Sequence, residues 1–421
     1  MRALRGMIGL CLVLAVVSRA SGRDPEMLPP VTDTPQRGMT LDQAVNLTLG
    51  NSPLLRQARA RIEQQQGLAV QAGLYPNPQQ NSGNPNQLGG GNSLYSVGIQ
   101  QEIVRAGKIP LNVAAAEQAV RQANLDLIRQ QFDAVTAVRQ QFFLLLAIQR
   151  RLATLQDLQK IAQQSLDITI KLRQAEQATE TDMLLLQIES RRIEASLRSA
   201  AFTASSAAQQ LAALIGLPDL KIERALGDLS VKLPDFNDPQ VRGELLTRST
   251  LIESARAEIA RNEFLLRRAE AEPTPNLILN SGYQWTVNQP HSQALIGTYF
   301  NIPIWDRNQG NIRAAGANVR QAMAQLNSVQ NDLLRQLAEA LGRYHAAQVT
   351  VSVYQQGILP DAQRTYELVQ KGLEGGQFDL LRILQSQRSV IEANLDYISA
   401  LQDRLSAAAT IAGLLQLKQF P

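Results

Sequence analysis

The sequence predicts a mainly helical fold with a smaller membrane β part, built from one unit that is repeated in tandem. Three observations carry this prediction. Apolar residues recur at helical spacing over very long stretches, shorter segments alternate apolar and polar residues, and both features occur once in each half. The composition agrees, because 44% of the 421 residues are hydrophobic but only 5% are aromatic, as in long helices packed along narrow seams.

Residues 1–20 have the pattern of a secretory signal peptide, and residues 21–40 form an N-terminal extension. Arg2 and Arg5 give a basic start, an apolar run too short to cross a bilayer follows, and small residues precede the expected cleavage site. Cys11, the single cysteine, lies inside that run, so we expect no disulfide or reactive thiol in the mature chain. Removing the three arginines of this segment lowers the formal charge from +4 to +1, which gives no support for a nucleic acid partner.

The two halves share an ordered series of identical residues. The tetrapeptide VRQA occurs at 120–123 and 319–322, about 200 residues apart, and further matches keep nearly the same offset. Ser52, Asp182, Arg191 and Gly216 match Ser249, Asp379, Arg388 and Gly413. The sequence therefore predicts repeat 1 over residues 41–227, a linker over residues 228–243 and repeat 2 over residues 244–417.

Each repeat opens with a predicted helix, over residues 41–74 and 243–272. A Pro-x-Pro motif, at residues 76–78 and 273–275, ends each helix. Proline has this effect because it lacks an N–H group and its ring clashes with the preceding helical turn.

Membrane strands follow in each repeat, within residues 77–104 and 275–305. In the second repeat Leu279, Tyr283 and Trp285 alternate with polar or small residues, and residues 93–103 alternate in the same way in the first. Residues 294–305 are predicted to form the return strand of the second repeat. Residues 79–92 are polar and rich in glycine and proline, so the sequence leaves open whether they form a strand.

A very long helix and a return helix complete each repeat. In the first repeat, apolar residues spaced near every 3.5 positions predict a left-handed coiled-coil seam over residues 108–173. A break near residues 174–181 precedes a return helix that Asp182 is predicted to cap and that ends at Gly216.

The second repeat follows the same plan. Its long helix is predicted to break at residues 372–376, and its return helix covers residues 379–415. Pro360, with Gly357 before it, lies inside the long helix and is expected to kink it.

The predicted lengths indicate how the elements are arranged. The helix over residues 108–173 is about 100 Å long at 1.5 Å per residue, and the opening helix and return helix together have about the same length. This match predicts a shaft with hairpin tips at one end and strands at the other. Four strands cannot close a membrane barrel, but three copies supply twelve, so we expect a homotrimer.

Three stretches carry a resemblance to a known family. They are "QAGLYPNPQ", "QQEIVRAGKI" leading into "AAAEQA", and "ILPDAQRTYELVQKGLEGGQFDLLRILQSQRSVIEANLDYISAL". Together with the duplication, they make the chain resemble the outer-membrane factors, the TolC family of exit ducts, over residues 41–417. The stretches are most similar to the branch that serves heavy-metal and other cation efflux pumps.

The resemblance implies a trimer with a twelve-stranded β-barrel in the outer membrane of a Gram-negative bacterium, in contact with outer-membrane lipid. It also implies a twelve-helix tunnel across the periplasm, which docks to a periplasmic adaptor protein and an inner-membrane pump. The pump would supply the energy, and this chain would be a passive, gated conduit for metal cations or small toxic molecules.

The resemblance also implies where the functional residues lie. Acidic residues at the start of the second return helix narrow the tunnel entrance in the family, and Asp379 stands at the first such position. Arg382 stands at the second, which departs from the acidic pair of some members. An N-cap role for Asp379, as for Asp182, is an equally good interpretation. The expected adaptor contacts are the two turns, with Glu180, Thr181, Gly372, Glu374, Gly375 and Gly376.

Tyr283, Trp285 and Trp305 fit an aromatic belt at the membrane interface, with ordinary core packing as the alternative. The sequence gives no support for an enzyme, a cofactor or a metal site. His291 and His345 are far apart, and no glycine-rich loop follows a strand in the manner of a phosphate site.

Three other interpretations stay open at this point. A protein-secretion exit duct has the same architecture and differs only in its pump. A periplasmic adaptor also contains a helical hairpin, but one rather than two. A purely structural coiled-coil protein of the envelope would need neither strands nor a channel.

Overall fold

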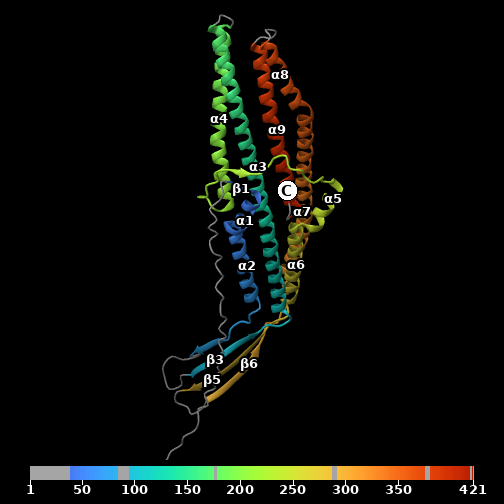
Figure 1. Ribbon diagram of the computed structural model, residues 1–421. Coiled ribbons are helices and arrows are strands. Elements are labelled where there is room, and N and C mark those ends of the chain that lie inside the picture. Colours follow the sequence, from blue (N-terminus) through green and yellow to red (C-terminus); the bar gives the residue numbers. More distant parts are fainter. Residues whose placement is uncertain are drawn as a thin grey trace, which may run out of the picture. The chain divides into compact units, whose positions relative to one another are not determined.

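The computed structural model describes residues 38–83, 94–174, 178–286, 292–374, 380–417 and 420. The predicted signal peptide and most of the N-terminal extension lie outside these residues. Contacts between residues separate the chain into Met1–Gln36 and Arg37–Pro421, and everything below concerns the second unit. Figure 1 shows its helices and strands in chain order.

The nine described helices and six described strands fall into two similar series. The first series is β1 Met39–Thr40, α1 Leu41–Asn51, α2 Pro53–Ala72, β2 Gln79–Gly83, β3 Leu94–Ile103, α3 Lys108–Gln174 and α4 Glu180–Ile215. The second is β4 Ala225–Leu226, α5 Asp238–Arg248, α6 Thr250–Ala271, β5 Leu277–Thr286, β6 Ser292–Tyr299, α7 Gln309–Val353, the π-helical turn Tyr354–Ile358, α8 Leu359–Glu374 and α9 Leu380–Leu414.

The prediction of a single opening helix in each repeat was wrong. In the first repeat the helix breaks at Ser52, which has an extended backbone (ψ 123°) because the following Pro53 disfavours the helical conformation. The second repeat breaks at the equivalent Ser249, with nearly the same ψ of 122°, although no proline follows it. The second opening segment also begins earlier than predicted, at Asp238.

The first long hairpin agrees closely with the prediction. The long helix α3 covers Lys108–Gln174, and the return helix α4 ends before Gly216, which adopts the left-handed conformation (φ 90°). The cap at the start of α4 was predicted one turn too late. Thr179 is the N-cap, and Asp182 is the residue three positions on that completes a capping box with it.

The two return helices end differently, which corrects the match of Gly216 with Gly413. In the second repeat the left-handed residue is Gln416 (φ 56°), three positions beyond Gly413. Its N–H and that of Leu417 make the same closing hydrogen bonds as those at Gly216. Gly413 instead lies inside α9 against the side chain of Thr136, where no Cβ would fit.

The second long helix changes its hydrogen-bonding pattern just before Pro360, where the sequence predicts a kink. Residues Tyr354–Ile358 form a π-helical turn between α7 and α8, so the chain continues without a gap. Proline cannot donate a backbone hydrogen bond, and a π turn is one way for a helix to accommodate the missing donor. The predicted break at residues 372–376 begins later, because α8 continues through Gly372 to Glu374.

The four long strands form one antiparallel sheet in the order β2-β3-β5-β6. Residues 79–83 are therefore a strand, which answers the question that the sequence left open, while residues 84–92 lie outside the described residues. The strand β6 ends at Tyr299 rather than at residue 305. The following FNIPIW segment contains Pro303, which lacks the N–H that a strand needs for pairing.

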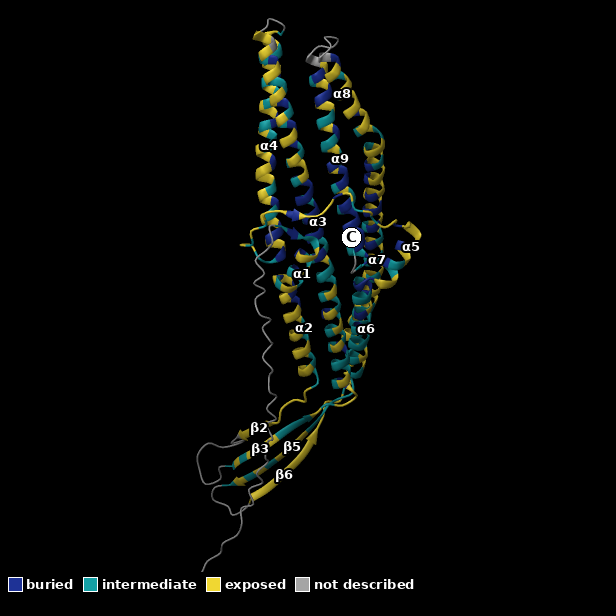
Figure 2. Cartoon of the chain, viewed as in Figure 1, coloured by how far each residue is buried: buried dark blue, intermediate teal, exposed yellow. Residues whose placement is uncertain are grey.

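The main hydrophobic core lies where α1 and the parallel pair β1–β4 pack against the long helices. Phe142 and Leu145 of α3 meet Leu211 of α4 and Leu405 of α9 there. Figure 2 shows this buried region partway along the helices, with exposed residues dominating toward the tips. Within the described residues, no helix is long and apolar enough to cross a membrane.

The residues of the repeated VRQA motif occupy equivalent places. Ala123 of α3 and Ala322 of α7 are both buried, while Arg121 and Arg320 are exposed. The motif therefore marks corresponding turns of the two long helices, as the register of the duplication predicted.

Candidate functional site

The sheet exposes its apolar face. Tyr95, Val97 and Ile99 of β3 lie beside Trp285, Tyr283 and Ser281 of β5, and the apolar members of this set are all exposed. The rings of Tyr95 and Trp285 stack with their centres 5.8 Å apart. In a protein surrounded by water, such a face would be covered by a second layer. An exposed apolar face of this size is suited to a nonpolar environment.

The opposite face of the sheet is polar, and the backbone at two glycines on this face leaves no room for larger side chains. Gly98 and Gly282 are direct cross-strand partners on this face. A Cβ on Gly98 would lie 2.6 Å from Asn81 Oδ1 and 3.0 Å from the Ser281 carbonyl oxygen, so only glycine fits. Gln100, Asn280 and Gln284 share this face because they alternate with the exposed apolar residues.

The three predicted interface aromatics do not form one cluster. The ring centres of Tyr283 and Trp285 lie 6.1 Å apart, near the end of β5. Trp305 lies beyond the last residue of β6, and it is 86% exposed. The aromatic residues therefore flank the strands, and β3 and β5, at 10 residues each, have the length of strands that cross a bilayer.

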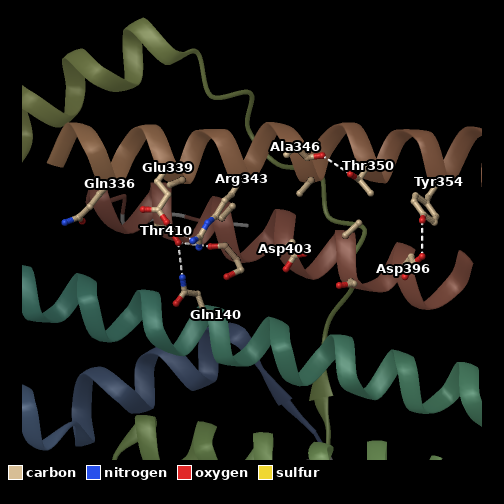
Figure 3. Close-up of a pocket in the computed structure, with 16 residues that line it drawn as sticks. Gln140, Gln336, Glu339, Arg343, Ala346, Thr350, Tyr354, Asp396, Asp403 and Thr410 are labelled. Atoms are coloured by element: carbon tan, nitrogen blue, oxygen red, sulfur yellow. Dashed lines mark hydrogen bonds and ion pairs between the residues drawn. The ribbon is translucent and has the colours of Figure 1, made fainter. Parts of the chain in front are cut away.

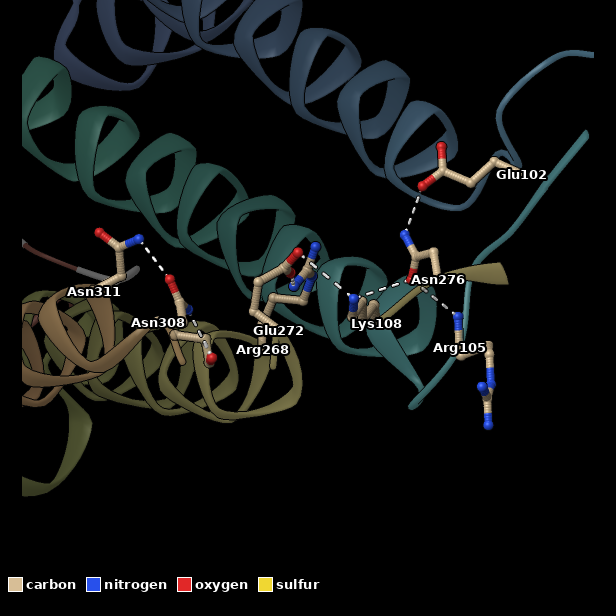
Figure 4. A network of polar contacts seen from close by, with 9 residues as sticks. Glu102, Arg105, Lys108, Arg268, Glu272, Asn276, Asn308 and Asn311 are labelled. Atoms are coloured by element: carbon tan, nitrogen blue, oxygen red, sulfur yellow. Dashed lines mark hydrogen bonds and ion pairs between the residues drawn. The ribbon is translucent and has the colours of Figure 1, made fainter. Parts of the chain in front are cut away.

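A polar network joins the sheet to the helices (Figure 4). Lys108, the first residue of α3, is only 2% exposed, and its ammonium lies 3.0 Å from Asn276 Oδ1 and 3.5 Å from Glu272. The side-chain amide of Asn276 donates in turn to Glu102 at 2.6 Å. The network therefore links the end of β3, the start of α3, the end of α6 and the start of β5.

The carboxylate of Glu272 in this network is held in its charged form. Burial favours the neutral form of Glu272, but the hydrogen bonds and charges of Arg268 and Lys108 outweigh it and lower its pKa. Sequence reasoning missed this joint. The only signal was a lysine at the start of a helix, where the helix dipole disfavours a positive charge.

The first hairpin tip exposes two of the predicted adaptor contacts, Glu180 and Thr181. Glu180 pairs with Arg173 across the turn at 3.7 Å. Below them, the Asp182 carboxylate accepts hydrogen bonds from the Thr179 hydroxyl at 2.7 Å and from its backbone N–H at 2.9 Å. These hydrogen bonds lower the pKa of Asp182.

The second tip is only partly described. Gly372 lies within α8, and Glu374 is the last residue of that helix. Gly375, Gly376 and Asp379 lie outside the described residues. Arg382 is exposed in the first turn of α9.

A polar groove runs between α7, α9 and α3 (Figure 3), with a volume of about 790 Å³. The carboxylates of Glu339, Asp396 and Asp403 line it. Two hydrogen bonds span it, from Tyr354 to Asp396 at 3.0 Å and from Gln140 to Thr410 at 2.9 Å.

The groove lies on the side of α9 that faces away from the segment containing β4. Ile398 and Leu401 pack into one core with Leu229 of that segment. Asp396 and Asp403 each stand two residues from one of them, a rotation of about 200° around the helix. The helical layer therefore has a covered apolar face and an open polar face.

One of the two histidines lies within the described residues. His345 Nε2 lies 3.2 Å from Asp238 Oδ1 at the start of α5, and His291 lies outside the described residues. The described residues contain no cluster of three or more metal-ligating side chains.

Comparison with known proteins finds a matching family model and a related protein of similar length. Residues 241–415 match the family model for "outer membrane efflux protein". The cobalt-zinc-cadmium resistance protein CzcC of Cupriavidus metallidurans is 27% identical over 385 residues, which cover 90% of each chain.

Solved structures of outer-membrane channels have the same fold at lower sequence identity. A structure of CusC is 18% identical with a TM-score of 0.78, covering 89% of this chain and 91% of that one. The channel OprN is 20% identical with a TM-score of 0.77 and covers 89% of both chains. The MtrE channel of Neisseria gonorrhoeae, solved in its open state, is 18% identical with a TM-score of 0.75, covering 89% and 88%.

Proposed function

We propose that this chain, a member of the outer membrane efflux protein family, forms the exit duct of a tripartite efflux system. The duct conducts substrates passively across the periplasm and the outer membrane of a Gram-negative bacterium. A periplasmic adaptor protein and an inner-membrane pump deliver the substrate, and the pump supplies the energy.

The observation that carries this proposal is the polarity of the sheet. Its exposed face is apolar, with Val97, Ile99 and Leu279, and its other face holds Gln100, Asn280 and Gln284. This is the arrangement of a strand between lipid and an aqueous lumen. The same chain continues directly into helices that carry an open polar groove, so one molecule provides both parts of a conduit.

The sheet is incomplete, which supports a homotrimer. Within the described residues, the edge strands β2 and β6 each pair on one side only. Unpaired strand edges cannot lie in hydrocarbon, because their N–H and C=O groups have no other partners there. Three copies close the edges of all three sheets and give twelve strands.

The tips of the two helical hairpins are the proposed contacts for the adaptor. Glu180, Thr181 and Gly372 lie at the end of the helices farthest from the sheet (Figure 1). Arg382 lies in the first turn of α9, at the same end of the second hairpin, and Asp379 directly precedes α9 in the sequence. We propose that the tunnel entrance is formed there. We also propose that repeat 1 ends near residue 227 and that the helices of repeat 2 begin with α5, at Asp238.

The proposed substrates are divalent transition-metal cations, with small toxic molecules as the wider class. The named relative is a cobalt-zinc-cadmium resistance protein, and it matches over 90% of both chains. This match favours efflux over protein secretion by the same kind of duct. Two helical hairpins with two strand pairs also differ from the single hairpin of a periplasmic adaptor, and the sheet differs from a purely structural coiled coil.

The test has two parts. The protein extracted in detergent should be a trimer, and after reconstitution it should give stable single-channel currents in planar lipid bilayers. In a strain that lacks its own metal-exporting duct, the chain together with its cognate pump and adaptor should restore growth in cobalt, zinc or cadmium salts. A water-soluble monomer without currents would exclude the duct, and currents without restored resistance would exclude these metals as substrates.

A further inference from the structure

A second pocket lies between α1, α3 and the C-terminal residues Leu417 and Phe420, and we call it the α1–α3 pocket. Its volume of about 920 Å³ is within the range of ligand-binding pockets, and most of the residues that line it are apolar. One wall comes from α1 and the other from α3. These walls are formed by Leu41, Val45 and Leu49 of α1 and by Ile128, Phe132 and Val135 of α3.

The α1–α3 pocket and the polar groove open on different sides of α3. Val135 lines the pocket and Gln140 lines the groove, and five residues correspond to a rotation of about 140° around a helix. Seven residues beyond Arg139, which also lines the pocket, Leu146 lies on the same side of α3. Leu146 packs into the core that contains Leu229 of the segment after β4. A molecule in the α1–α3 pocket therefore does not occupy the polar groove.

The α3 wall of the pocket is an elongated stripe. Ile128, Phe132 and Val135 follow one another by four and three residues, so they lie on one side of the helix. Arg139 continues this stripe four residues further on. At 1.5 Å per residue, the stripe from Ile128 to Arg139 is about 16 Å long. The pocket therefore suits an extended apolar molecule with a charged group at one end.

Arg139 brings a buried positive charge to the end of the stripe. This residue is only 4% exposed, and its guanidinium group lies 4.9 Å from the centre of the Phe420 ring. Burial lowers the pKa of Arg139, and the negative charge of Asp42 in the first turn of α1 opposes this effect. A guanidinium group keeps its proton in proteins. A charge in surroundings of low dielectric constant attracts an anion more strongly than the same charge in water.

The charged residues of the lining favour an anion over a neutral molecule or a cation. Arg59 of α2 contributes a second positive charge, and Asp42 is the one acid among the described residues that line the pocket. Asn46 and Gln131 add neutral amides. Two positive charges against one negative charge leave the pocket with a net positive charge, which complements an anionic ligand.

We propose that the α1–α3 pocket binds a long-chain carboxylate, with its carboxylate group at Arg139 and its apolar chain along the stripe toward Ile128. A guanidinium group pairs with a carboxylate through two parallel hydrogen bonds, and the apolar walls remove the chain from water. Ile128 lies 20 residues, or about 30 Å, along α3 from Lys108 at the sheet. The ligand is therefore a free acid rather than a lipid seated in the membrane.

This inference goes beyond the proposed function and does not depend on it. The ligand lies on a different side of α3 from the polar groove, so it is not the exported substrate. It would instead be held between the opening helix α1 and the long helix α3 of one copy.

Photolabelling tests the site. The protein is reconstituted in lipid nanodiscs without free detergent, because a detergent would compete for the pocket. A decanoic acid analogue with a photoreactive diazirine near the end of its chain should label peptides from residues 41–49 or 128–135. Unlabelled decanoate should suppress this labelling. Decanol and decyltrimethylammonium lack the negative charge, so they should need concentrations about tenfold higher or more.

Variants separate the charge from the apolar walls. Arg139→Gln removes the charge and should weaken competition by decanoate about tenfold or more, while Arg139→Lys should recover part of this loss. Arg59→Gln is the matched control. Arg61 lies 3.9 Å from Asp126, which places Arg59 toward the Ile128 end of the stripe, away from the carboxylate. Its effect should therefore be less than about threefold.

A pocket-filling variant keeps the test sharp where Arg139→Gln does not fold. Val45→Trp fills the space between the walls without changing a charge, and it should abolish labelling of residues 128–135.

Three results would overturn the inference. They are labelling confined to the sheet, competition by decanol at the same concentration as decanoate, and unchanged labelling in Val45→Trp. Labelling confined to the sheet is also the result expected if another copy or another segment of the chain fills the pocket. None of these results touches the proposed function, because conductance and metal resistance are measured without the carboxylate.

Discussion

The ammonium group of Lys108 lies 3.0 Å from the side-chain oxygen of Asn276, and this contact fastens the first turn of α3 to the start of β5. The two residues are 168 positions apart and come from different repeats. The contact is therefore a link between the repeats as well as between the sheet and the helices.

Replacing the buried lysine should weaken this joint. Lys108→Met removes the ammonium and leaves Arg268 as the one ion-pair partner of Glu272 among the described residues, which should cost about 1–3 kcal/mol of folding free energy. The cost should fall toward the lower limit, because Asn276 Oδ1 still accepts a bond from the Arg105 N–H. The thermal unfolding midpoint in detergent measures the effect. Lys160→Met, at an exposed pair with Asp157, is the control and should change little.

The two faces of the sheet should respond differently to a charge. Ile99→Arg places a charge on the exposed apolar face, which costs about 2–4 kcal/mol near the middle of a bilayer. Gln100→Arg places the same charge one residue further on, on the polar face, and should be tolerated. Quantitative immunoblots of trimer in outer-membrane fractions measure both variants. Equal yields of the two would contradict a lipid-facing role for Ile99.

Much of the helical architecture could be predicted because its signals are local. The seam that runs along α3 is a repeating pattern of apolar residues, and Gly216 marks the end of α4 by its own conformational freedom. The break at Ser249 has no such signal, since no proline follows it, and only the structure shows it. The end of the second repeat at Gln416 also escaped prediction, because contact with Thr136 rather than chain reversal requires glycine at Gly413.

Less of the candidate site could be predicted, because fewer of its features have a local signal in the sequence. The alternation in β3 and β5 predicts which residues share a face, and the structure places them together. The joint at Lys108 and the groove beside Asp396 each depend on contacts between residues far apart in the sequence. A single sequence contains no periodic signal for such contacts.

The capping box at the first tip should stabilise the start of α4 locally. Asp182→Asn weakens its two bonds to Thr179, and loss of a cap costs about 1 kcal/mol. Amide hydrogen exchange of residues 180–186 should become faster, with no change in the middle of α3. Asp157→Asn, at an exposed position of α3, is the matched control.

The same cap should be lost in acid. The bonds from Thr179 lower the pKa of Asp182 from 3.8, so its contribution is complete above pH 3.8 and disappears as the pH falls through the lowered value. Exchange protection of the first turn of α4, corrected for the intrinsic rate, should therefore fall in strong acid in the natural protein. The Asp182→Asn variant should show no such dependence.

Asp379 should narrow the tunnel entrance electrostatically. Asp379→Ala is expected to raise single-channel conductance or to weaken block by multivalent cations, because it removes one carboxylate from each copy of the trimer. Asp182→Ala, at the matching position of the first repeat, is the control for loss of a helix cap alone. If Asp379→Ala changes neither property, Asp379 is a helix cap without a role in conduction.

The hydrogen bond between Tyr354 and Asp396 should restrain the π-helical turn. It ties the first residue of that turn to α9 at 3.0 Å, just before Pro360 removes a backbone donor. Tyr354→Phe should speed amide exchange of residues 354–360, while global stability falls by no more than about 1 kcal/mol, as for an exposed hydrogen bond. Asp396→Asn keeps an acceptor and should preserve the restraint.

The hydrogen bond to Asp396 raises the pKa of Tyr354 above 10.0, so the restraint should be complete below pH 10.0 and disappear only as the pH rises through the raised value. Unchanged exchange in Tyr354→Phe would mean that the packing of α7 on α9 alone holds the turn.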